Sequence, residues 1–151
     1  MSSVNLEQLK KLRNETSASI ADCRKALEES GGDYNKAITW LQKHGVEKAE
    51  KKADRKTAQG LVDSYIHQNS KVGGLVSVLC ETDFVARTSE FKSLAHEIAM
   101  QVAAMNPKDV ESLLKQEYIR DGSKTIEQLV KETIAKLGEN IVIKEFKRFE
   151  I

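Results

Sequence analysis

The sequence predicts an α+β protein in which a group of N-terminal helices precedes a small antiparallel sheet packed with helices. Three observations support this prediction. Residues 4–45 show helical periodicity interrupted by turn residues, strand patterns begin at Gly60, and a long helical stripe and a final apolar strand follow.

Three short helices are expected within residues 4–45. Asn5, Ser19 and Asp33 can each cap a helix, because their side-chain oxygens can accept hydrogen bonds from free backbone N–H groups of a first turn. Gly45 follows the last apolar position of the third helix and is expected to close it in a left-handed conformation. Helices of this length can bury their apolar stripes only against one another. We therefore expect residues 1–45 to form a compact helical module.

Residues 46–59, VEKAEKKADRKTAQ, are rich in charge and in good helix formers but lack a wide apolar stripe. This composition predicts an exposed helical linker. The local basic excess could contact phosphates, and a solvated helix face is the simpler explanation.

Residues 60–151 are expected to form an α+β core. LVDSYIHQ and KVGGLVSVLC read as two strands joined by a turn, and the second is apolar enough for a central strand. Thr88 is expected to cap a helix that runs to about Met105, and a second helix is expected over about Ser123–Leu137. The segment ENIVIKEFKRFEI reads as the last strand.

Composition limits the possible functions. The chain has 151 residues, a net charge of +1 and only 5% aromatic residues, so neither a global basic surface nor stacking platforms for single-stranded nucleic acid are expected. The two cysteines, Cys23 and Cys80, lie in apolar runs and are expected to be buried thiols in a reducing compartment. No signal-peptide pattern opens the sequence and no apolar run has the length of a membrane span, so we expect a cytoplasmic protein.

No pattern indicates catalysis. His44, His67 and His96 are far apart and have no further ligand at metal-binding spacing, and neither a phosphate-binding GxxxxGK loop nor a GxSxG elbow occurs. Gly73 and Gly74 lie inside an apolar strand, where close packing or a bulge explains them. We expect a protein that is not an enzyme and holds no cofactor or metal ion.

One position stands out at the end of the second strand. Glu81, Thr82 and Asp83 end the apolar run abruptly, and Phe84 follows at a strand-to-helix corner. A lone phenylalanine near a helix start normally packs into the core, whereas a side chain at the tip of a short polar connection tends to point outward. The residues alone leave both positions of Phe84 open.

Three segments in order, LRNETSASIADCRKALEESGGD, ETDFVARTSEF and AKLGENIVI, resemble the elongation factor Ts family of guanine-nucleotide exchange factors for elongation factor Tu. The resemblance covers most of the chain and implies a ubiquitin-associated-like three-helix module before the core. Two departures are evident: TSAS at Thr16–Ser19 replaces the usual TGAG, and there is room for one core half where long members carry two. Residues 107–122 match no motif.

The resemblance implies exchange without bond chemistry. Phe84 would enter between two helices of elongation factor Tu, and Thr82, Asp83, Phe84 and Val85 together would displace the magnesium ion that holds GDP. The remaining contacts would dock the factor, and they are expected at Leu12, Arg13, Ile20, Leu137 and Gly138.

Two other functions remain possible from the sequence. A protein-binding adaptor would use only the three-helix module, and a nucleic-acid-binding protein would use the basic residues 48–56. In either case we expect no membrane partner, and for the exchange factor no direct nucleic-acid partner.

A symmetric homodimer is also predicted, because three strands with one helical layer leave one sheet face uncovered. Phe146 and Phe149 alternate along the last strand, so one of them is expected to face outward, and no cysteine lies nearby to form a covalent link. The alternative is a monomer whose second sheet face is covered by the long helices.

Overall fold

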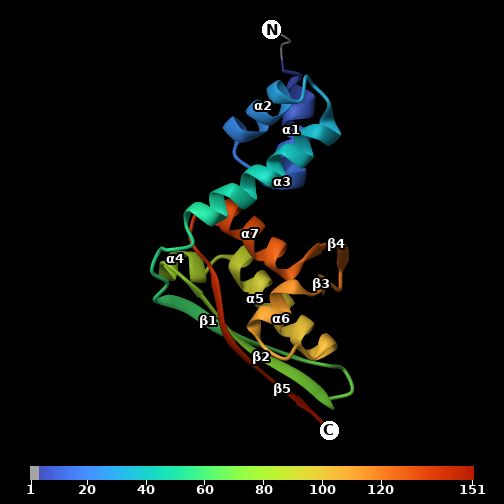
Figure 1. Ribbon diagram of the computed structural model, residues 1–151, viewed down its shortest axis with the longest axis vertical. Helices are drawn as coiled ribbons and strands as arrows, with labels where there is room; N and C mark the ends of the chain where they lie inside the picture. The colour runs from blue at the N-terminus through green and yellow to red at the C-terminus, as the bar shows by residue number, and fades with distance from the viewer. Residues whose placement is uncertain (1–3) are drawn as a thin grey trace.

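The computed structural model describes residues 4–151, so residues 1–3 of the predicted helical module lie outside the described residues. The α+β class predicted from the sequence is confirmed (Figure 1). The elements are α1 (Leu6–Thr16), α2 (Ile20–Glu29), α3 (Tyr34–Lys51), β1 (Gln59–Ile66), β2 (Val72–Cys80), α4 (Asp83–Ala86), α5 (Ser89–Met105), α6 (Val110–Lys115), β3 (Glu117–Tyr118), β4 (Asp121–Thr125), α7 (Ile126–Leu137) and β5 (Val142–Glu150).

Helices α1, α2 and α3 begin at the three predicted caps. The side chains of Asn5, Ser19 and Asp33 each accept a hydrogen bond from a backbone N–H of the first turn that follows. These caps satisfy donors that no earlier turn of the helix can reach. The helices bury one shared cluster, which consists of Leu9, Leu12, Cys23, Ala26, Leu27, Ala37 and Leu41.

The prediction that Gly45 ends the third helix is wrong. Helix α3 continues through Gly45 to Lys51, and its second half reaches the core, where Ala49 is buried (Figure 1). Residues 46–51 are good helix formers, so the helix continues past Gly45. Gly45 lies where α3 crosses α7, and because it has no side chain the two helices can approach each other closely there. The predicted linker is therefore partly a packed continuation of α3. How the chain divides into independent units stays a prediction.

The sheet has the order β1–β2–β5, and both pairs are antiparallel. Strand β2 is central, as its apolar composition predicts. The predicted close packing at Gly74 is confirmed, because an added Cβ atom would lie 2.5 Å from the Ala99 carbonyl oxygen of α5. Glycine thus lets α5 lie directly on β2.

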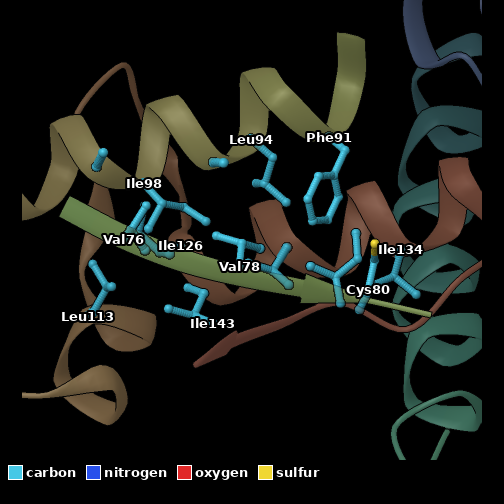
Figure 2. Close-up of a cluster of buried hydrophobic side chains, with 14 of the residues drawn as sticks. Val76, Val78, Cys80, Phe91, Leu94, Ile98, Leu113, Ile126, Ile134 and Ile143 are labelled. Atoms are coloured by element: carbon cyan, nitrogen blue, oxygen red, sulfur yellow. The ribbon is translucent and has the colours of Figure 1, made fainter. Parts of the chain in front are cut away.

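The main core lies between β2, α5 and α7. Figure 2 shows Phe91, Leu94 and Ile98 of α5 directed toward Val76 and Val78 of β2. Helices α5, α6 and α7 all lie on one side of the sheet (Figure 1). This single helical layer was predicted, and within residues 4–151 no helix lies over the opposite sheet face.

Residues 107–125 contain three elements that the sequence pattern did not predict, namely α6, β3 and β4. The helix expected from Ser123 begins at Ile126, because Ser123 to Thr125 belong to β4 and Thr125 forms a capping box with Gln128. The fully buried Gln101 of α5 anchors this region, since its side chain accepts a hydrogen bond from the Ile119 N–H and donates one to the Glu117 carbonyl oxygen.

Candidate functional site

After β2, residues 81–86 form a strand-to-helix corner, and its single helical turn, α4, has exposed residues on its outer side. Thr82 has an extended backbone, and its hydroxyl accepts a hydrogen bond from the Val85 N–H at 3.3 Å, which caps α4. The thiol of Cys80 donates to the Thr82 carbonyl oxygen at 3.1 Å. Burial, and then the charge of Glu139, raise the pKa of that thiol, which keeps it protonated as a donor. These two contacts provide hydrogen-bond partners for the Val85 N–H and for the Thr82 carbonyl oxygen.

Phe84 points away from the protein's own core. Its side chain is 78% exposed, whereas Ala86 of the same turn is buried and Val85 packs against the core. A ring of this size normally gains its stabilisation from burial. The question that the sequence left open is answered for the free protein: Phe84 does not fill the core.

Asp83 lies beside Phe84 and is exposed. Its carboxylate accepts a hydrogen bond from the Arg87 guanidinium at 3.1 Å, one helical turn away. Both side chains are more than half exposed, so this ion pair adds little stability. The Asp83 carboxylate is therefore free to exchange this contact for another.

The turn that follows α7 lies against the same corner. Gly138 ends α7 in a left-handed conformation, with φ of 76°, and the next residue, Glu139, reaches Thr82. The Glu139 carboxylate accepts hydrogen bonds from the Glu81 N–H at 3.2 Å, the Thr82 N–H at 2.9 Å and the Thr82 hydroxyl at 2.7 Å. Glu139 thus holds the turn that follows Leu137 and Gly138 against Thr82.

In a second set of contacts the roles are exchanged: the corner supplies the carboxylate, and the turn after α7 supplies the backbone N–H. The Glu81 carboxylate accepts from the Asn140 N–H at 3.1 Å and lies 3.6 Å from the Arg55 guanidinium. The buried Asn140 side chain donates to the carbonyl oxygens of Ala53 and Arg55, at 3.2 and 3.0 Å. These contacts tie the segment after α3, the corner and the C-terminal turn together.

The other predicted docking residues lie in the N-terminal helices. Arg13 and Ile20 are exposed and line a cleft of about 720 Å³ between these helices and α7, whose Ala135 and Lys136 form part of the opposite wall. The corner and the cleft wall therefore share α7. Leu12 is different, because its side chain is fully buried among α1, α2 and α3. Its side chain does not reach the surface. It packs α1, the helix that carries Arg13, against α2 and α3.

The cleft also contains a charged cluster. The Lys48 ammonium donates to the Asp22 carboxylate at 2.6 Å, and His44 lies 3.6 Å from the same group. Burial acts to raise the pKa of Asp22, but the hydrogen bonds from Lys48 and Ser19 outweigh it and hold that pKa below its usual value. Asp22 thus stays ionised and links α2 to α3 at the cleft wall.

The TSAS departure has a structural consequence. Ser17 follows α1 in a left-handed conformation, with φ of 54°, which disfavours residues with a side chain. Glycine at this position, as in the usual family pattern, would adopt it without strain. Ser19 in contrast caps α2 through its hydroxyl.

Sequence reasoning missed the roles of Glu81, Glu139 and Asn140. Glu139 and Thr82 are 57 positions apart, and no linear spacing connects them. The available signal was a polar pair directly after a helix-ending glycine. Within residues 4–151 no group of three or more His, Cys, Asp or Glu side chains could hold a metal ion, and no helix there is long and apolar enough to cross a membrane.

Comparisons with known proteins agree with the three motifs. The family model described as elongation factor TS matches residues 81–151. An elongation factor Ts of Thermoanaerobacter sp. (strain X514) is 42% identical over 192 residues, which cover 97% of this chain and 94% of that protein. The elongation factor Ts of Coprothermobacter proteolyticus is 41% identical, with 98% of both chains covered, and that of Rippkaea orientalis is 41% identical over 99% of this chain and 78% of the relative.

These alignments are longer than the 151 residues of the chain, so the relatives carry residues that this chain lacks. The alignments nevertheless cover nearly the whole chain, and the family model covers the corner and the turn after α7. The chain therefore belongs to the elongation factor Ts family and is a factor of translation elongation.

Proposed function

We propose that this protein binds GDP-bound elongation factor Tu and promotes GDP release, so that GTP can bind. Family membership supports elongation factor Tu as the partner. One observation carries the proposal: Phe84, a large apolar side chain, is 78% exposed on a corner whose backbone is held by hydrogen bonds. A ring displayed in this way is suited to insertion into another protein.

In the proposed mechanism Phe84 enters between two helices of elongation factor Tu. Thr82, Asp83, Phe84 and Val85 then disturb the shell of the magnesium ion that holds GDP, and the nucleotide leaves. No covalent bond is made or broken, so the protein acts as an exchange factor rather than an enzyme and needs no cofactor of its own.

A single side chain cannot supply the whole effect. Burying one phenylalanine contributes about 1.5–3 kcal/mol, whereas weakening a nucleotide a thousandfold requires about 4 kcal/mol. Leu137 and Gly138 lie next to the corner and would add contacts near the phosphate end. The factor and GDP must also weaken each other's binding to elongation factor Tu by equal factors.

The docking contact is proposed at Arg13 and Ile20. Both are exposed on the wall of the cleft between the N-terminal helices and α7. Leu12 would contribute indirectly, because it fixes the helix on which Arg13 lies. In this proposal residues 1–45 dock the partner and residues 60–151 carry the exchange and dimer surfaces. Helix α3 takes up the first part, residues 46–51, of the predicted linker over 46–59.

We further propose that two copies pair through the open face of the sheet. This face displays apolar side chains that are each 40% or more exposed, namely Val62, Ile66, Leu75, Val142 and Phe149. The register places these side chains on one face, because Val142 pairs with Leu79 and Phe149 pairs with Gly73 of the central strand. Glu145 and Lys147 of β5 lie between them on the same face. Phe146, three positions before Phe149, faces the other side of the sheet and packs against the core instead.

A dimer would cover the exposed apolar side chains of this face. The alternative monomer requires the long helices to cover this face, and they lie on the other one. A two-fold arrangement places identical faces against each other and closes the assembly. The cytoplasm, where translation takes place, is the proposed compartment.

The adaptor function predicts a different use of the same surfaces. It requires only the three N-terminal helices and leaves the exposed Phe84 without a purpose. The nucleic-acid alternative relies on residues 48–56, where Ala49 is buried and Lys48 pairs with Asp22. Neither alternative accounts for the corner, so we favour exchange.

The test is GDP release. Elongation factor Tu carrying fluorescent GDP is mixed with this protein and excess unlabelled nucleotide, and the fluorescence decay is followed. We expect accelerated release at substoichiometric amounts of the protein. Release at the spontaneous rate would refute exchange, and binding without release would favour the adaptor. Binding to nucleic acid that falls steeply with salt would favour the third function.

A further inference from the structure

The corner that carries Phe84 is too short to be stable through its own local hydrogen bonds. Helix α4 spans only four residues, and an isolated helical turn is unstable because its nucleation is unfavourable. Phe84 and Asp83 are exposed and contribute no packing of their own. The conformation of the corner must therefore be fixed by its neighbours.

Glu139 is the neighbour that makes the most direct contacts. One carboxylate oxygen accepts from two consecutive backbone N–H groups, those of Glu81 and Thr82, and the other accepts from the Thr82 hydroxyl. Hydrogen bonds to an ionised acceptor are stronger than neutral ones. The Thr82 hydroxyl in turn accepts from the Val85 N–H, so the carboxylate orients the group that caps α4.

The arrangement is reciprocal. While Glu139 of the C-terminal turn holds the backbone of the corner, Glu81 of the corner accepts a hydrogen bond from the Asn140 N–H. Two carboxylates from segments almost sixty positions apart thus each bind the other segment's backbone. Leu137 and Gly138 precede Glu139 directly, so the two proposed contact groups form one unit.

We propose that Glu139 is a positioning residue for nucleotide exchange, which fixes the Thr82–Val85 corner and its exposed Phe84 in the conformation that engages the partner. This inference rests on the proposed function. Its physical basis is preorganisation: a corner that is already ordered loses less conformational entropy when it binds. Glu139 itself does not need to contact the partner or its magnesium ion.

A purely structural role would have different consequences. If Glu139 only stabilised the fold, its loss would lower the unfolding temperature and leave the exchange activity of the folded fraction unchanged. If it positions the corner, its loss must loosen the corner locally and lower the maximal rate of GDP release, while the docking contacts at Arg13 and Ile20 keep the half-saturating concentration.

The experiment compares Glu139→Ala and Glu139→Gln with Glu111→Gln as the matched control. Glu111 lies on α6, its side chain is 78% exposed, and it forms an ion pair with Lys115 one turn away. Amide hydrogen exchange is measured at Glu81 and Thr82, with Val78 of the central strand as an internal reference. The maximal rate and the half-saturating concentration of GDP release are measured on the same samples below the unfolding temperature.

For Glu139→Ala we expect about tenfold faster amide exchange at Glu81 and Thr82, the size of one lost charge-assisted hydrogen bond, with Val78 unchanged. The maximal release rate should also fall by about tenfold. The half-saturating concentration should change by less than about twofold, whether up or down. Glu139→Gln should lie between wild type and alanine, because its amide oxygen can still accept from both N–H groups. Glu111→Gln should match wild type.

Two results would overturn the inference. Unchanged amide exchange at Glu81 and Thr82 in both variants would mean that Glu139 does not hold the corner. Faster amide exchange with an undiminished maximal release rate would reduce Glu139 to a structural role. Failure of the proposed function is separate, because it would appear as a wild-type protein that does not accelerate GDP release at all.

Discussion

Gly45 of α3 faces Ala135 of α7 so closely that a Cβ atom added to Gly45 would lie 3.4 Å from the Ala135 Cβ. This contact lies at the crossing of α3 and α7, the two helices that connect the N-terminal cluster to the core. An ion pair between Lys131 and Glu50 lies five residues later in α3 and four residues earlier in α7, with 3.6 Å between the charged atoms. The crossing therefore sets how Arg13 and Ile20 lie relative to the Phe84 corner.

The crossing can be tested by enlarging Gly45. Gly45→Ala should be close to neutral, because better helix propensity of about 1 kcal/mol offsets a tight contact. Gly45→Leu should destabilise by about 1–3 kcal/mol through overpacking, or displace the N-terminal helices. Denaturant unfolding and small-angle scattering measure both effects. Equal stability and identical scattering for the alanine and leucine variants would show that the crossing tolerates separation.

Phe84→Ala is expected to slow GDP release by one to two orders of magnitude without unfolding the protein. The ring is exposed, so its loss removes about 1.5–3 kcal/mol from the complex rather than from the fold. Stopped-flow release and a thermal melt measure the two quantities. Ile119→Ala, at an exposed apolar position between β3 and β4, serves as control. A large drop in the melting midpoint for Phe84→Ala, of the size seen for core positions, would contradict this assignment.

The docking residues should separate into two kinds. Arg13→Ala and Ile20→Ala together should raise the half-saturating concentration about tenfold and leave the maximal rate intact, because they remove contacts made before and after GDP leaves. Leu12→Ala should instead cost about 2–5 kcal/mol of folding stability, since this side chain is fully buried. Lys10→Ala on α1, outside the cleft, is the control. Unchanged affinity in the double variant would place docking elsewhere.

The open sheet face predicts the oligomeric state. Light scattering at micromolar concentration should give about twice the chain mass of 16.9 kDa. Leu75→Lys on the central strand should return the protein to a monomer, because a dimer would bury its charge without a partner. Lys92→Glu, on the exposed side of α5 away from this face, should remain dimeric. A wild-type mass of one chain would rule out the dimer.

Ser17 offers a test of the departure at TSAS. Ser17→Gly should raise the unfolding free energy by about 0.5–1 kcal/mol, because it relieves a left-handed conformation at the cost of a more flexible unfolded chain. That corresponds to a rise of about 1–4 °C in the midpoint for a chain of this size. Ser19→Gly should lower stability by a few tenths of a kcal/mol, since it removes a capping hydroxyl. Thermal melts of both variants would show opposite signs, and a stabilising Ser19→Gly or a destabilising Ser17→Gly would contradict this account.

The sequence by itself determined the elements whose causes are local. The caps at Asn5, Ser19, Asp33 and Thr88 were predictable because each depends on side-chain oxygens within three residues of the N–H groups they satisfy. The sheet with one helical layer followed from apolar periodicity, and family membership followed from three motifs in order. The predictions failed where long-range contacts decide: α3 passes Gly45 because α7 packs there, and residues 107–125 form a short helix and a strand pair that Gln101 anchors.

Only the tertiary structure decided which way Phe84 points and what holds its corner. A lone phenylalanine between polar residues carries no periodicity that distinguishes a core position from a surface one. Its exposure follows from how β2 ends, how α4 is capped and where the turn after α7 lies. The Glu139 contact joins residues that are distant in sequence, so it exists only after the sheet and α7 have packed together. Docking residues show the same limit, since Leu12 and Arg13 are neighbours in sequence and only packing buries one and exposes the other.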